Sequence, residues 1–148
     1  MMEDLHTHLR KELVHIFTER GYEILGAKSF EGFTPAPFLP NDGYGDQEKK
    51  QPDVFALDPA EERFVIGLVK TGIHDLETQA ALTEYDVFFD HVNPGNKKRS
   101  LVYFMMPASY VADFTAMITH YIHRDYWENM VIVSSQPEAD QLSPEKKE

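Results

Sequence analysis

The chain contains no cysteine among its 148 residues. This absence excludes disulfides, thiolate metal sites and thiol nucleophiles, and it fits a reducing compartment, so we expect a cytoplasmic protein. No apolar run approaches the roughly 18 residues that a membrane-spanning helix needs. The polar N-terminal segment MMEDLHTHLRKE is also unlike a signal peptide. We therefore expect no membrane partner.

Basic side chains are scarce beside acidic ones: 14 Lys and Arg stand against 25 Asp and Glu, which gives a formal net charge of -11. Nucleic-acid binding draws much of its affinity from Lys and Arg contacts with phosphates. The balance therefore weakens the prediction of a nucleic-acid partner and leaves a protein partner open. The one tight basic cluster comprises Lys97, Lys98 and Arg99, which either contact phosphates or form a solvated loop.

Hydrophobic residues make up 42% of the chain, which favours a packed fold over disorder. The length suits one domain with a core of its own. We predict a single domain over residues 1–135 and a disordered acidic tail over residues 136–148.

Apolar periodicity predicts the secondary structure. The predicted helices span residues 4–20, 74–92 and 109–123, and Gly21 is a plausible stop for the first. The predicted strands span residues 22–29, 53–57, 63–70, 101–106 and 130–134. Residues 30–51 are rich in Pro, Gly and Asp and read as a long loop. The order α-β-β-β-α-β-α-β predicts an α/β fold in which helices flank a mixed central β-sheet.

Two neighbouring predicted strands carry charged residues at matching ends. Pro52-Asp53 opens one strand and Lys70 ends the next. Strand side chains alternate, so residues 68 and 70 point to one face. Carboxylates gathered there could hold a hard, oxygen-seeking cation. A Lys beside them could then stabilise the charge that develops on a phosphate.

This arrangement resembles the PD-(D/E)XK nuclease superfamily, where an Asp opens one strand and an acid and a Lys sit two apart on the next. The segment RKELVHIFTERGYEILGAKS is similar to the first helix and strand of archaeal Holliday-junction resolvases. A helical Glu adds a metal ligand in those enzymes, and Glu12 is the matching residue. The resemblance covers about residues 9–92. It implies a restriction-endonuclease-like fold and hydrolysis of DNA or RNA phosphodiesters with Mg²⁺ or Mn²⁺.

The chain departs from the pattern at Leu68, which stands where the acid before X-Lys is expected and cannot bind a metal. Some restriction enzymes of the superfamily take their second acid from the following helix, where this chain has Glu84 and Glu77. Under this hypothesis Asp53 and one of those two hold the metal, with Glu12 as an added ligand. Lys70 then polarises the attacking water. The alternative is a catalytically degenerate domain that acts as a protein-interaction or regulatory module, and both Leu68 and the acidic balance favour it.

Three other patterns invite functional interpretations. Residues 4–8 (DLHTH) resemble the Asp-X-His-X-His metal motif of amidohydrolase barrels, but they precede a helix and we interpret them as its polar start. His120 and His123 lie three apart and could share a zinc ion, although no third ligand is obvious and a surface role is favoured. The aromatic residues near the last helix are interpreted as packing groups rather than a base-stacking platform: Tyr121, Tyr126 and Trp127.

Overall fold

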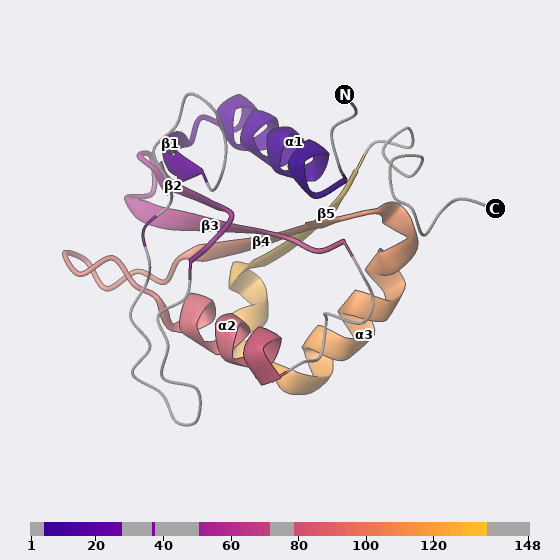
Figure 1. Ribbon diagram of the computed structural model, residues 1–148. Helices are drawn as coiled ribbons and strands as arrows, with labels where there is room; N and C mark the ends of the chain where they lie inside the picture. Colours follow the sequence, from indigo (N-terminus) through magenta and orange to yellow (C-terminus); the bar gives the residue numbers. More distant parts are fainter. Residues whose placement is uncertain (1–4, 28–36, 38–50, 72–78, 136–148) are drawn as a thin grey trace.

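The structure, a computed structural model, describes residues 5–27, 37, 51–71 and 79–135. Five strands form one sheet in the order β1-β2-β3-β4-β5, with helices on both of its faces (Figure 1). The strands are β1 (Glu23–Ala27), β2 (Val54–Asp58), β3 (Arg63–Val69), β4 (Leu101–Met106) and β5 (Met130–Ser134). The α-helices are α1 (Leu5–Glu19), α2 (Gln79–Asp90) and α3 (Val111–Tyr121). The predicted mixed α/β arrangement and its element order are confirmed.

The sheet combines two kinds of strand pairing. β1, β2 and β3 form an antiparallel meander, whereas β3, β4 and β5 are parallel. Each parallel connection crosses over through a helix, α2 for the first and α3 for the second. Two short 3₁₀ helices, η2 (Ala108–Tyr110) and η3 (Arg124–Asn129), flank α3. η3 was not predicted from the sequence, because so short a helix has no apolar period that could reveal it.

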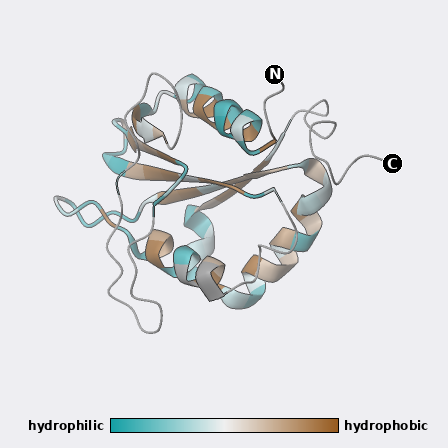
Figure 2. Ribbon diagram, viewed as in Figure 1, coloured by the Kyte–Doolittle hydropathy of each residue, from teal (hydrophilic) through white to brown (hydrophobic). Residues whose placement is uncertain are grey.

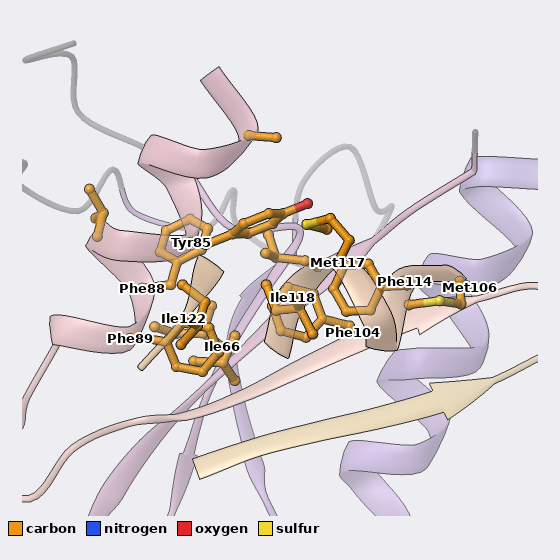
Figure 3. Packing of buried hydrophobic residues seen from close by; sticks show 14 of the residues in the cluster. Ile66, Tyr85, Phe88, Phe89, Phe104, Met106, Phe114, Met117, Ile118 and Ile122 are labelled. Carbon is orange, nitrogen blue, oxygen red and sulfur yellow. The ribbon is translucent and has the colours of Figure 1, made fainter. Parts of the chain in front are cut away.

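Alternation along the strands divides the core into two layers. One set of strand side chains packs with α1 on what we call the α1 face, and it includes Val54, Val65, Val69 and Tyr103. The other set packs with α2 and α3 on the opposite, α2–α3 face. Figure 2 shows apolar strands lying between amphipathic helices. Figure 3 shows Tyr85, Phe88, Phe104 and Phe114 clustered on the α2–α3 face.

Two glycines shape the packing of α1. Gly21 has a positive φ of 84° and ends the helix, with Tyr22 N–H donating to the Phe17 carbonyl at 2.9 Å and Gly21 N–H to the Thr18 carbonyl at 3.1 Å. These two bonds define a Schellman motif, so the predicted stop is confirmed. Gly67 lies beneath α1, where a Cβ atom would come within 2.6 Å of Leu13 Cδ2. Its missing side chain allows α1 to pack close to the sheet.

The β2–β3 turn is fastened to the loop between α2 and β4. Glu62 has a φ of 56°, a left-handed conformation that is uncommon for a residue other than glycine. Its carbonyl accepts hydrogen bonds of 2.8 Å from both Asn93 Nδ2 and Asn96 Nδ2. Lys98 Nζ also donates to the Glu61 carbonyl at 2.7 Å. The two loops therefore support each other.

Candidate functional site

Asp53 immediately precedes β2 and is buried, with 7% of its surface exposed. Its Oδ2 accepts a 2.9 Å hydrogen bond from the Val69 backbone N–H. Val54 and Gly67 form the last residue pair of the β2–β3 ladder at this end of the sheet. The carboxylate therefore takes the place of the backbone acceptor that a further pair would supply. A buried N–H without such an acceptor would be costly.

The second oxygen of Asp53 faces α1. Arg10 Nη2 donates to Asp53 Oδ1 at 3.2 Å, and the Arg10 side chain is only 7% exposed. His6 Nε2 lies 3.6 Å from the same oxygen, while His6 Nδ1 is 2.6 Å from Arg10 Nη2. Because the guanidinium can only donate, Nδ1 accepts and the imidazole proton sits on Nε2, toward the carboxylate. Arg10 thus holds Asp53 from α1, with the His6 imidazole beside the same oxygen.

Lys70 follows β3 and is also buried, with 8% of its surface exposed. Its Nζ lies 3.9 Å from Glu84 Oε1 and 5.0 Å from the centre of the Tyr85 ring. Both partners belong to α2, so the ammonium group combines an ion pair with a cation–π contact. Lys70 is therefore not a solvated strand end, because α2 covers it.

Different helices therefore contact the two motif residues, α1 at Asp53 and α2 at Lys70. The structure brings Lys70 and Glu84 together, as the sequence analysis expected of a migrated acid. In the described part of the chain, however, the neighbours of the Asp53 carboxylate on α1 are the Arg10 guanidinium and the neutral His6 imidazole. Asp53 is engaged from the α1 face and Lys70 from the α2–α3 face.

Leu68 stands at the position of the motif acid and is 3% exposed. It belongs to the apolar core of the α2–α3 face, together with Ile66 and Phe104. Its packing role accounts for a leucine here, since a carboxylate in that layer would be desolvated. The α2–α3 core occupies the place where the superfamily pattern expects an acid.

The remaining predicted ligands lie elsewhere. Glu12 Oε2 is 2.7 Å from His8 Nε2, one turn away on α1, and does not pair with Asp53. Glu77 lies outside the described residues. Within the described ranges, no three His, Asp or Glu side chains are grouped so that they could hold a metal ion. Because protein donors occupy both oxygens of Asp53, the described residues do not fit a Mg²⁺ or Mn²⁺ site at this carboxylate.

The sequence analysis did not include Arg10 in the site. The indication was its spacing: Arg10 precedes Leu13 by three residues and Phe17 by seven, which places it on the buried side of α1. A cation at such a position needs a buried anion. The anion is Asp53. The pairing depends on how α1 lies across the sheet, which periodicity does not determine.

The other candidate residues have local partners. Lys98 Nζ lies 3.5 Å from Glu61 Oε1, and the Arg99 guanidinium lies 4.3 Å from the centre of the Tyr126 ring. Two of the three residues in the basic cluster are thus engaged within the chain. His123 Nδ1 accepts from the Asp125 N–H at 3.1 Å and caps η3, which supports a structural role over a zinc ligand.

Two of the hollows that described residues line differ in size and setting. The larger, of about 560 Å³, lies between the β2–β3 turn and the loop from Asn93 to Asn96. The amides of Asn93 and Asn96 are already used by the Glu62 carbonyl. The smaller, of about 190 Å³, lies between α2 and the segment from the end of α3 into η3.

Comparisons of the chain with models of protein families, with curated proteins and with solved structures found no match. The resemblance to nucleases therefore rests on the residues alone. No helix in the described ranges is both long and apolar enough to cross a membrane. The cytoplasmic location stays a prediction.

Proposed function

We propose that the chain is a restriction-endonuclease-like domain that does not cleave phosphodiesters and acts as a protein-interaction or regulatory module. The element order and the mixed sheet agree with the fold that the resemblance implies. The residues that would form a catalytic centre serve instead to hold the domain together. The proposal therefore separates ancestry, which the motif suggests, from activity.

One observation carries the proposal: each oxygen of the Asp53 carboxylate accepts from the protein, Oδ1 from Arg10 and Oδ2 from the Val69 N–H. A metal ion at this carboxylate would have to displace a guanidinium that is itself buried. Stranding a buried charge in this way costs several kcal/mol, about 3–5 when one partner of a buried pair is lost. The same carboxylate would also have to release the end of the β2–β3 ladder.

The overall charge supports binding of a basic protein. A net charge of -11 repels nucleic-acid phosphates and attracts positively charged surfaces over a distance set by the ionic strength. The basic cluster of residues 97–99 is the region that could reverse this preference locally. Lys98 of this cluster is paired with Glu61 and Arg99 is stacked on Tyr126, as described above. The cluster therefore presents less uncompensated positive charge to phosphates.

A metal-dependent nuclease is the second candidate function, and the Lys70–Glu84 contact favours it. In that hypothesis Asp53 with Glu84 or Glu77 would hold Mg²⁺ or Mn²⁺, and Lys70 would polarise the water. Asp53 would first have to release Arg10 and the Val69 N–H.

A cleavage assay separates the two candidates. Supercoiled plasmid and single-stranded RNA are incubated with Mg²⁺ or Mn²⁺ and either the wild type, Asp53→Asn, Lys70→Met or the exposed control Glu23→Gln. We expect no metal-dependent cleavage above the protein-free level. Cleavage by the wild type and the control, lost in both other variants, would establish the nuclease and end our proposal. Equal cutting by all four proteins indicates a contaminating enzyme.

A further inference from the structure

The smaller hollow is a pocket formed by three elements, and we call it the α2–η3 pocket. It encloses about 190 Å³. Drug-sized ligands and cofactors need pockets of about 300 Å³ or more, so this one suits the end of a single side chain. Its lining combines two carboxylates, three aromatic rings, one aliphatic side chain and one imidazole: Asp86, Asp90, Phe89, Tyr121, Tyr126, Ile122 and His123.

The two carboxylates lie one helical turn apart on α2, where like charges destabilise a helix. Within the described part of the chain, neither Asp86 nor Asp90 forms an ion pair. Asp90 Oδ1 accepts a 2.7 Å hydrogen bond from the Tyr126 hydroxyl. Burial and the neighbouring charge of Asp90 raise the pKa of Asp86. Both carboxylates are exposed at the mouth of the pocket, and Arg99 reaches only the Tyr126 ring beside them.

Aromatic rings form the walls around these carboxylates. Phe89 is buried, and its ring centre lies 5.9 Å from that of Tyr126. Tyr121 is 47% exposed, so its ring is accessible from solvent. Ring faces attract cations, and aromatic cages are a known means of binding alkylammonium groups. Arg99 already uses the Tyr126 ring in this way, at 4.3 Å.

The volume of the pocket, its carboxylates and its aromatic lining together favour one kind of ligand. A positive group would neutralise Asp86 and Asp90, while its apolar stem could lie along Phe89 and Ile122, as the stems of Lys and Arg do on apolar surfaces. A phosphate or a carboxylate would meet two like charges. The pocket thus discriminates by chemistry against the anionic ligands of nucleases.

We propose that the α2–η3 pocket receives a lysine or arginine side chain from a basic protein partner. The inference rests on the proposed function as an interaction module, and the acidic character of the chain extends the attraction beyond the pocket. A single side chain contributes a weak, local anchor, and neighbouring contacts of the partner add the rest of the affinity.

An NMR titration of the ¹⁵N-labelled full chain tests this assignment. The probes are the capped tripeptides acetyl-Gly-Arg-Gly-amide and acetyl-Gly-Lys-Gly-amide, with acetyl-Gly-Gln-Gly-amide as the uncharged control and methylguanidinium as a free small cation. We expect saturable shifts centred on Asp86, Phe89 and Tyr121 for at least one of the charged tripeptides. The glutamine peptide should cause none. Methylguanidinium should bind more weakly than the arginine tripeptide.

Matched variants separate the pocket from general charge. Asp86→Asn combined with Asp90→Asn should weaken binding at least tenfold. Asp113→Asn combined with Glu23→Gln removes the same charge from exposed positions outside the pocket and should weaken it less than twofold. Tyr121→Ala truncates an exposed ring without disturbing the core and should weaken binding severalfold.

Three results would overturn the inference. They are an absence of saturable shifts at the pocket, an equal loss of binding in the two double variants, or methylguanidinium binding as tightly as the tripeptide. The last result would assign the pocket to a small amine instead of a protein side chain. The cleavage assay remains independent: metal-dependent cutting with pocket binding intact would reject the proposed function, and a binding failure without cleavage would reject only this inference.

Discussion

The two faces of the sheet each bury one charged motif residue, and they do so differently. On the α1 face, Asp53 and Arg10 meet at 3.2 Å with side chains 10% and 7% exposed. On the α2–α3 face, Lys70 Nζ and Glu84 Oε1 are 3.9 Å apart, and the Glu84 side chain is 30% exposed. The first pair is cut off from water on both sides, whereas the second keeps one solvated partner. We therefore expect burial of both partners, more than the distance between them, to decide how much each pair contributes to stability.

Removing the α1-face carboxylate should have the largest effect. Asp53→Ala leaves the Arg10 guanidinium buried without its anion and the Val69 N–H without its acceptor. We expect the free energy of unfolding to fall by about 3–5 kcal/mol, measured by urea denaturation. Asp53→Asn keeps an acceptor oxygen and should lose less, and the exposed control Glu23→Ala should stay within about 0.5 kcal/mol of the wild type. A loss below about 1 kcal/mol for Asp53→Ala would show that the pair is not structural.

The second largest effect should come from disturbing the close packing of α1 on the sheet. Gly67→Ala places a methyl group 2.6 Å from Leu13 Cδ2 and 3.1 Å from Phe17 Cζ, so the Leu13 side chain or the helix must shift. We expect a loss of about 1–3 kcal/mol in stability. Gly95→Ala is the matched control, because its nearest contact would be 3.4 Å away, at Asn93 Oδ1. Equal urea midpoints for the two variants would contradict close packing of α1 on the sheet.

Breaking the Lys70–Glu84 pair on the α2–α3 face should cost less stability than breaking the Asp53–Arg10 pair on the α1 face. Lys70→Met keeps the apolar stem of the side chain, and the partly exposed Glu84 can return to water. We expect a loss of about 1 kcal/mol or less, as for solvent-accessible ion pairs. Thermal and urea unfolding of Lys70→Met and Asp53→Ala, measured side by side, give the two losses of unfolding free energy for comparison. If Lys70→Met proved the more damaging change, the ranking of the two faces would be reversed.

The smallest expected effect concerns protonation on the α2–α3 face. His91 Nδ1 lies 2.8 Å from Ser100 Oγ, beside the rings of Phe55 and Phe64, and burial lowers the pKa of His91. The unfolded chain therefore binds this proton more readily than the folded one, so acidification below the ordinary histidine pKa of about 6.5 favours unfolding. Stability measured from pH 7.5 down to pH 5 should fall more steeply for the wild type than for His91→Gln. Parallel curves would show that His91 titrates normally.

Most of the fold follows from local patterns. The helix α1 is predicted by its apolar stripe and by the glycine at its end. The strand β4 is predicted by its continuous apolar run. In β2 and β3 the alternation of side chains also assigns residues to the two core layers, so Leu68 and Lys70 were correctly expected on one face. The short helix η3 had no comparable pattern and was missed.

The site was less predictable because its partners come from different parts of the chain. Glu12 was proposed as a companion of Asp53, but Arg10 takes that place. Residues two apart on a helix point in very different directions, so only one of them can face the end of β2. Which one does so depends on the rotation of α1 about its axis. That rotation is set by the packing of Leu13 and Phe17 over Gly67, a contact between segments some fifty residues apart in sequence.

The carboxylate that closes the β2–β3 ladder has an evolutionary consequence. A residue with such a role would be retained by natural selection for a folded chain even in lineages that no longer perform any chemistry. Counting this aspartate as a hallmark of activity would then place inert descendants among the enzymes. The identity of the residue two before the lysine, together with the charge of the first helix opposite the aspartate, would distinguish the two groups more reliably.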